Sequence, residues 1–131
     1  MSSEERNVNA GQLKLRMAQY GETCMIQLDG ELDLANAAAL EQELDAALRN
    51  GNARVIVDMS ELTFIDSTGI ALLVTAAGGA DGNGDGNGEG RVRFLRSRAA
   101  AVNRVLDLTG VAERLPFADA SADGDGSSVR A

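Results

Sequence analysis

The sequence contains no histidine and a single cysteine, Cys24. Without histidine, neither a Ser-His-Asp or Cys-His nucleophilic site nor a histidine-based metal centre can be built. A single cysteine excludes an internal disulfide bond and a cysteine-rich zinc site. One tyrosine and three phenylalanines are too few for a platform on which nucleic-acid bases stack. Carboxylates are therefore the main groups left for catalysis.

Basic residues and long apolar runs are also scarce. The net charge is −8, and an acidic chain is a poor candidate for binding nucleic acid. A row of arginines is expected to be a solvated face rather than a nucleic-acid patch: Arg91, Arg93, Arg96 and Arg98. No apolar run approaches the ~18 residues of a membrane span, and Met1–Glu5 lack the pattern of a signal peptide. We expect a cytoplasmic protein with no nucleic-acid partner, membrane partner, cofactor or metal.

Alternation of apolar and polar residues indicates strands. The 131 residues, 44% of them hydrophobic, suit one domain with its own core. Strand patterns occur in residues 13–17, 23–28, 54–58, 92–95 and, as a short edge strand, 115–117. The first two predict an antiparallel hairpin that buries Cys24 on its apolar face, which makes an inert thiol the favoured interpretation. The β-branched run in the third is typical of a central strand.

Helical periodicity follows three of these strands. The patterns predict helices over about residues 34–48, 68–77 and 97–109. Asp33 or Asn36 is expected to cap the first helix, and Ser97 the third. The predicted order is β-β-α-β-α-β-α, which indicates an α/β fold with helices packed on a sheet.

Composition divides the chain further. We expect residues 1–10 to be a flexible N-terminus, 11–117 to form the domain and 118–131 to be a disordered tail. Within the domain, residues 78–90 form a glycine-rich insert, read as a flexible acidic linker. An EF-hand calcium loop is the alternative, but its twelfth position is Val92 rather than glutamate. The Gly-Lys-Ser/Thr of a P-loop does not occur.

Residues 64–69, Phe-Ile-Asp-Ser-Thr-Gly, follow the expected central strand and open a helix. Ser67 lies at or near the predicted N-cap, and a capping serine next to Asp66 is one interpretation. The other is functional, because the exposed N–H groups and positive dipole of a helix N-terminus favour a phosphoryl group. Gly69 would allow another protein's backbone or a nucleotide to approach.

Three segments resemble the STAS domain, and more closely the bacterial anti-sigma factor antagonists: residues 30–35 (Gly-Glu-Leu-Asp-Leu-Ala), 55–62 (Val-Ile-Val-Asp-Met-Ser-Glu-Leu) and 64–69. The likeness covers roughly residues 10–117 apart from the insert, which departs from the family pattern. It implies a small STAS-like α/β domain with a mixed sheet of four to five strands.

The resemblance also implies a partner-switching cycle. The unphosphorylated antagonist binds an anti-sigma factor that is also a serine kinase, and sigma factor is released. The kinase phosphorylates the first hydroxyl residue after the motif's aspartate, which is Ser67 here, and the complex then falls apart. A metal-dependent serine phosphatase restores the active form. Thr68 occupies the neighbouring motif position, where phosphorylation is not usual.

We therefore expect a regulatory binding module rather than an enzyme, with the loop 29–33 and the exposed side of the 68–77 helix as its docking surface. The expected contact residues are Asp29, Glu31, Asp33, Asp66, Thr68, Gly69 and Leu72. One alternative is a STAS subunit of a transport or scaffolding assembly without phosphoregulation, where Ser67 is only a cap. Another is a small hydrolase that uses the acidic cluster for acid–base chemistry.

Overall fold

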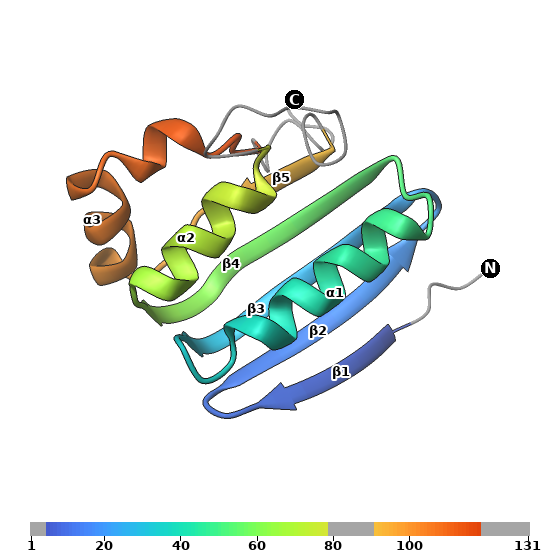
Figure 1. The fold of residues 1–131 in the computed structure, drawn as a ribbon, viewed down its shortest axis with the longest axis horizontal. Coiled ribbons are helices and arrows are strands. Elements are labelled where there is room, and N and C mark those ends of the chain that lie inside the picture. Colours follow the sequence, from blue (N-terminus) through green and yellow to red (C-terminus); the bar gives the residue numbers. More distant parts are fainter. Residues whose placement is uncertain (1–4, 79–90, 119–131) are drawn as a thin grey trace.

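The computed structural model describes residues 5–78 and 91–118. Its elements are, in chain order, β1 (Glu5–Ala10), β2 (Leu13–Tyr20), β3 (Thr23–Leu32), α1 (Ala37–Arg49), β4 (Arg54–Ile65), α2 (Ser67–Ala76), β5 (Val92–Leu95), α3 (Ala100–Leu108) and the 3-10 turn η1 (Val111–Arg114). The five strands form one sheet in the order β1-β2-β3-β4-β5. Figure 1 shows α1 and α2 side by side across one face of this sheet, with α3 beyond α2. The predicted α/β class and mixed sheet are confirmed.

The sheet combines a meander with two crossovers. Strands β1, β2 and β3 pair antiparallel, whereas β3–β4 and β4–β5 pair parallel and are connected through α1 and α2. Parallel neighbours require such crossover connections, and a helix is the usual one. β4 lies between β3 and β5, as its β-branched run predicts for an interior strand.

The apolar faces of strands and helices meet in one core. Cys24 and Ile26 of β3 lie opposite Val55 and Val57 of β4 in the register, and all four are buried. The predicted hairpin and the burial of Cys24 are thus confirmed. α1 adds Leu40, Leu44 and Ala47, and α2 adds Leu73 and Val74.

The structure corrects the prediction for the start of the chain. Residues 5–10, expected to be flexible, form β1 and pair with β2 along their whole length. The sequence Glu-Arg-Asn-Val-Asn-Ala has only a short apolar alternation, at Val8 and Ala10, because an edge strand has one neighbour and buries little. Only Val8 and Ala10 of this strand are half-buried, and Arg6 forms an ion pair with Glu43 of α1. The observed order thus begins with three strands rather than two.

Other element boundaries also differ. Residues 115–117 contribute an isolated bridge between Phe94 and Phe117 rather than a full strand. The first helix begins at Ala37 instead of residue 34, because Asp33–Asn36 form a turn. The parts of the insert at 79–90 and of the tail at 119–131 lie outside the described residues, so the expectations for them are untested.

Arg91 and Arg96 contact other parts of the protein, although the sequence predicts a solvated face for the row of four arginines. Arg91 donates hydrogen bonds to the carbonyl oxygens of Leu48 and Asn52, instead of facing solvent. Arg96 lies over the ring of Phe117, with 4.2 Å between its Cζ and the ring centroid.

Within the described residues, no helix is both long enough and apolar enough to cross a membrane.

Candidate functional site: the N-terminus of helix α2

Asp66 is the residue that begins α2. It is the N-cap, with extended backbone angles of −108° and −175°, and its Oδ1 accepts a hydrogen bond of 3.0 Å from the Gly69 N–H. Its backbone N–H donates to the carbonyl of Leu32, which fixes the end of β4 against β3. The cap is therefore Asp66, and Ser67 is the first helical residue rather than the N-cap. A carboxylate at this end also complements the helix dipole.

The second oxygen of Asp66 holds the loop between β3 and α1. Oδ2 accepts a hydrogen bond of 3.2 Å from the backbone N–H of Leu34. Asp33 shapes the same loop, because its Oδ1 accepts from the Ala35 N–H and its own N–H donates to Asn36 Oδ1. One carboxylate therefore joins two segments that lie far apart in the sequence.

Ser67 presents its hydroxyl to solvent in the first turn of α2. The side chain is exposed, and within the described residues its hydroxyl makes no hydrogen bond. Thr68, its neighbour, is half-buried. Ser67 does not cap the helix, because Asp66 is the N-cap. The hydroxyl is thus free to accept a phosphoryl group, which the exposed N–H groups of a helix N-terminus tolerate.

Gly69 is buried, and its role differs from the expected one. A Cβ built on this residue would lie 2.8 Å from Leu32 Cγ and 2.9 Å from Ile65 Cγ1. The glycine lets the first turn of α2 approach the ends of β3 and β4 closely. Gly69 therefore shapes the site through packing, and its burial leaves little of it for direct contact with a partner.

The other predicted contact residues divide into two groups. Glu31 is exposed and Asp33 half-buried, and both lie beside the loop that Asp66 holds. Leu72 is half-buried on α2 between the exposed Ala71 and Thr75. Asp29 does not lie beside this loop. It follows the core residue Leu28 in β3 and therefore faces the opposite side of the sheet, where its carboxylate lies 3.8 Å from Arg16. The acidic residues thus do not converge on one centre.

Two exposed apolar residues near the site were not predicted. Leu34 is 76% exposed in the loop bound to Asp66, and Phe64 is 47% exposed at the end of β4. The helical periodicity had assigned Leu34 to the start of the first helix. Recognising the turn at Asp33–Asn36 would have placed this side chain outside the helix. We call Leu34, Ser67, Ala71, Leu72 and Thr75 the switch surface. It combines the apolar side chains of Leu34, Ala71 and Leu72 with the hydroxyls of Ser67 and Thr75.

Among residues 5–78 and 91–118, no three carboxylate or cysteine side chains gather as metal ligands would. The EF-hand alternative concerns the insert, which lies outside those ranges. The arrangement is suited to docking and to covalent modification.

The chain belongs to the STAS domain family, because residues 15–117 match the family model described as "Mlab, STAS domain". Curated relatives include the anti-sigma factor antagonist BtrV of Bordetella bronchiseptica, 34% identical over 65 residues, or 50% of this chain and 56% of BtrV. The anti-sigma-F factor antagonist RsfB of Mycobacterium tuberculosis is 25% identical over 65 residues, which cover 50% of this chain and 53% of RsfB. The chain thus spans about half the length of these relatives.

Solved structures share the fold. An anti-sigma factor antagonist from Mycobacterium paratuberculosis superposes with a TM-score of 0.68 at 21% identity, covering 85% of this chain and 89% of that one. The unphosphorylated form of the anti-sigma factor antagonist SpoIIAA gives 0.63 at 19% identity, covering 85% and 93%. These likenesses establish the STAS fold, and the resemblance read from the sequence is confirmed at the level of the family.

Proposed function

We propose that this protein is an anti-sigma factor antagonist that works by partner switching. Unphosphorylated, it binds an anti-sigma factor that is also a serine kinase, and sigma factor is released. The observation that carries the proposal is the exposed hydroxyl of Ser67 in the first turn of α2, which makes no hydrogen bond within the described residues and shares the switch surface with the exposed apolar side chains of Leu34 and Ala71. The names of the curated relatives support the same role.

The switch surface explains how the two states would differ. In the unphosphorylated state, Leu34 and Leu72 can lose water against an apolar partner surface at little cost. A phosphate on Ser67 adds about −1.5 to −2 charges at neutral pH. In the free protein, this charge is solvated and lies at the positive end of α2. In the complex, it would be desolvated beside the Asp66 carboxylate.

The size of this penalty decides whether the switch is effective. A cost of ~3–4 kcal/mol in the complex would weaken binding by a factor of several hundred, since ~1.4 kcal/mol corresponds to tenfold. The fold itself should survive, because Ser67 is exposed and belongs to no buried network. A serine phosphatase would then reverse the switch. We place the whole cycle in the cytoplasm, and the chain acts in it as a kinase substrate rather than as an enzyme.

A pull-down with the unphosphorylated full chain, followed by mass spectrometry, tests this proposal. We expect an anti-sigma factor with a kinase domain among the captured proteins, and its loss when the bait carries Ser67→Asp. A STAS subunit of a transport or scaffolding assembly would share this fold, but its partner would bind the wild type and Ser67→Asp equally.

A further inference from the structure

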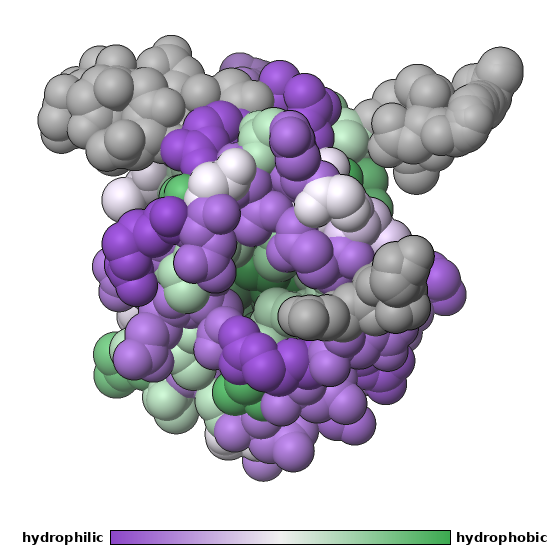
Figure 2. Space-filling model, turned by 90° about the vertical axis from the view of Figure 1, so that its right-hand side faces the viewer, coloured by the Kyte–Doolittle hydropathy of each residue, from purple (hydrophilic) through white to green (hydrophobic). Residues whose placement is uncertain are grey.

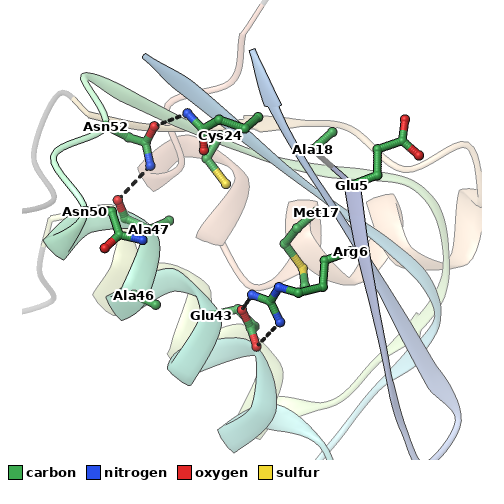
Figure 3. Close-up of a pocket in the computed structure, with 11 residues that line it drawn as sticks. Glu5, Arg6, Met17, Ala18, Cys24, Glu43, Ala46, Ala47, Asn50 and Asn52 are labelled. Atoms are coloured by element: carbon green, nitrogen blue, oxygen red, sulfur yellow. Dashed lines mark hydrogen bonds and ion pairs between the residues drawn. The ribbon is translucent and has the colours of Figure 1, made fainter. Parts of the chain in front are cut away.

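A cavity of about 450 Å³ lies between the sheet and the C-terminal half of α1. It is at the far end of α1 from the switch surface, because Ala46, Ala47 and Asn50 line it. Figure 3 shows Met17 of β2 and Cys24 of β3 extending from the sheet toward these residues. The cavity therefore has an apolar floor, built from two sulfur-containing side chains and two methyl groups. Figure 2, which views the side of the molecule where this end of α1 lies, shows hydrophobic residues at the bottom of a hollow.

Small residues at the end of α1 leave this space open. Closer to its start, α1 fills its core positions with Leu40 and Leu44, whereas the next core position is Ala47. Met17 and Cys24 each remain 7% exposed, while Leu15 and Ile26, their neighbours two residues along the same strands, are fully buried. The volume is in the range of small-molecule sites, which are typically 300–1,000 Å³.

Three charged residues line the cavity: Arg6 and Glu43 pair with each other, and Glu5 is exposed at the rim. Arg6 Nη2 lies 2.6 Å from Glu43 Oε1, and the other guanidinium nitrogen contacts Oε2. Glu43 raises the pKa of Arg6 through this hydrogen bond and its negative charge. An anionic ligand would have to compete with Glu43 for Arg6, and it would also face the Glu5 carboxylate. The lining thus favours a neutral occupant over an anionic one.

The other polar residues at the cavity include two asparagines, Asn50 and Asn52, and the side chain of Asn50 is available for further hydrogen bonds. Both polar atoms of the Asn52 side chain have a partner, since its Nδ2 donates to the Ala47 carbonyl and its Oδ1 accepts from Gln19. Asn50, at the C-terminus of α1, is exposed, and its side chain makes no hydrogen bond within the described residues. A carboxamide presents a donor next to an acceptor and pairs best with the same arrangement reversed.

We propose that this cavity binds a small neutral molecule with an apolar body and an edge that carries an adjacent donor and acceptor, such as a carboxamide or a lactam. The apolar body fills the floor at Met17, Cys24 and Ala47. The polar edge pairs with Asn50 at the rim. This site is independent of Ser67 phosphorylation, so its test does not depend on the proposed switch.

Titration of the ¹⁵N-labelled full chain with benzamide tests the proposal. We expect saturable amide shifts at Met17, Cys24, Ala46 and Ala47, with half-saturation at about millimolar concentration, as befits a ligand of this size. Benzoate has the same shape but carries a charge, and it should bind at least tenfold more weakly. Shifts that do not saturate by about 20 mM, or that lie elsewhere, would overturn the proposal.

A matched pair of variants on α1 gives the control. Ala47→Leu fills the cavity and should weaken benzamide binding at least tenfold. Ala38→Leu adds the same side chain to the exposed face of the same helix and should leave binding unchanged. If Ala47→Leu does not fold, Ala46→Leu replaces it. Equal binding of benzamide to the filled and control variants contradicts the site.

Discussion

The backbone N–H of Leu34 donates a hydrogen bond of 3.2 Å to Oδ2 of Asp66, across 32 positions of the sequence. The other oxygen of the same carboxylate receives the Gly69 N–H. A single side chain thus begins α2 and holds the β3–α1 loop beside it. The exposed Leu34 and the exposed Ser67 consequently belong to one continuous surface. A charge placed on Ser67 would alter the surface that Leu34 offers to a partner.

Asp66→Ala should lower the free energy of unfolding by about 1–2 kcal/mol, because the cap of α2 and the bond to the loop are both lost. Asp66→Asn should cost less, since its remaining carbonyl oxygen can still accept from Gly69. Urea unfolding measures both. Asp45→Ala, an exposed carboxylate on α1, is the control and should stay within about 0.5 kcal/mol of the wild type. Equal effects at the two positions would show that Asp66 is not a structural link.

Gly69→Ala should destabilise the fold by about 1–3 kcal/mol, as overpacking does. The new Cβ would lie less than 3.0 Å from side-chain atoms of Leu32 and Ile65, which are themselves buried. This cost exceeds the gain of about 1 kcal/mol that alanine brings over glycine within a helix. Thr75→Ala, at an exposed position of α2, is the comparison in the same urea experiment. A more stable Gly69→Ala protein would contradict the close packing.

Leu34→Ser should weaken binding to the anti-sigma factor about tenfold or more while leaving stability almost unchanged. The side chain is 76% exposed and contributes little to the core, so its apolar surface matters only when a partner covers it. Leu108→Ser is the matched control, because Leu108 is 80% exposed on α3, away from the switch surface. Calorimetric titration with the partner measures both variants. Similar losses for the two would place the docking surface elsewhere.

Cys24 should react slowly with the charged reagent DTNB until the protein unfolds. Burial raises the pKa of its thiol above the ordinary value of 9.0, so less thiolate is present at any given pH. Because the folded state disfavours the thiolate, the free energy of unfolding should fall as the pH rises above 9 and through the higher folded-state pKa. Cys24→Ala should lose that part of the pH dependence. Rapid stoichiometric labelling of the native protein at pH 8 would refute the burial.

Much of the fold could be predicted because its core follows simple periodicities. Cys24, Ile26 and Leu28 alternate strictly, and the structure buries all three on the face that α1 covers. β1 escaped prediction because an edge strand needs few apolar residues, and its side-chain contact with α1 is the exposed ion pair of Arg6 with Glu43.

The site was predicted less completely, for reasons of local geometry. Ser67 and Asp66 are both good capping residues, and sequence alone does not decide which of them adopts the extended backbone of the N-cap. Leu34 lies in a turn before the helix, and this turn depends on hydrogen bonds among Asp33, Ala35 and Asn36. The spacing of apolar residues does not reveal such hydrogen bonds. Gly69 was expected to admit a partner, but the close packing against Leu32 becomes visible only in three dimensions.

Modification of Ser67 by the cognate kinase tests the central claim most directly. The full chain is incubated with the kinase and ATP, the modified residue is mapped by peptide mass spectrometry, and the affinity for the kinase is measured before and after. We predict phosphate on Ser67, an unchanged fold and affinity reduced by a factor of about several hundred. Ser67→Ala should bind the kinase but accept no phosphate. Phosphate found only on Thr68, or equal affinity of the two forms, would contradict the account.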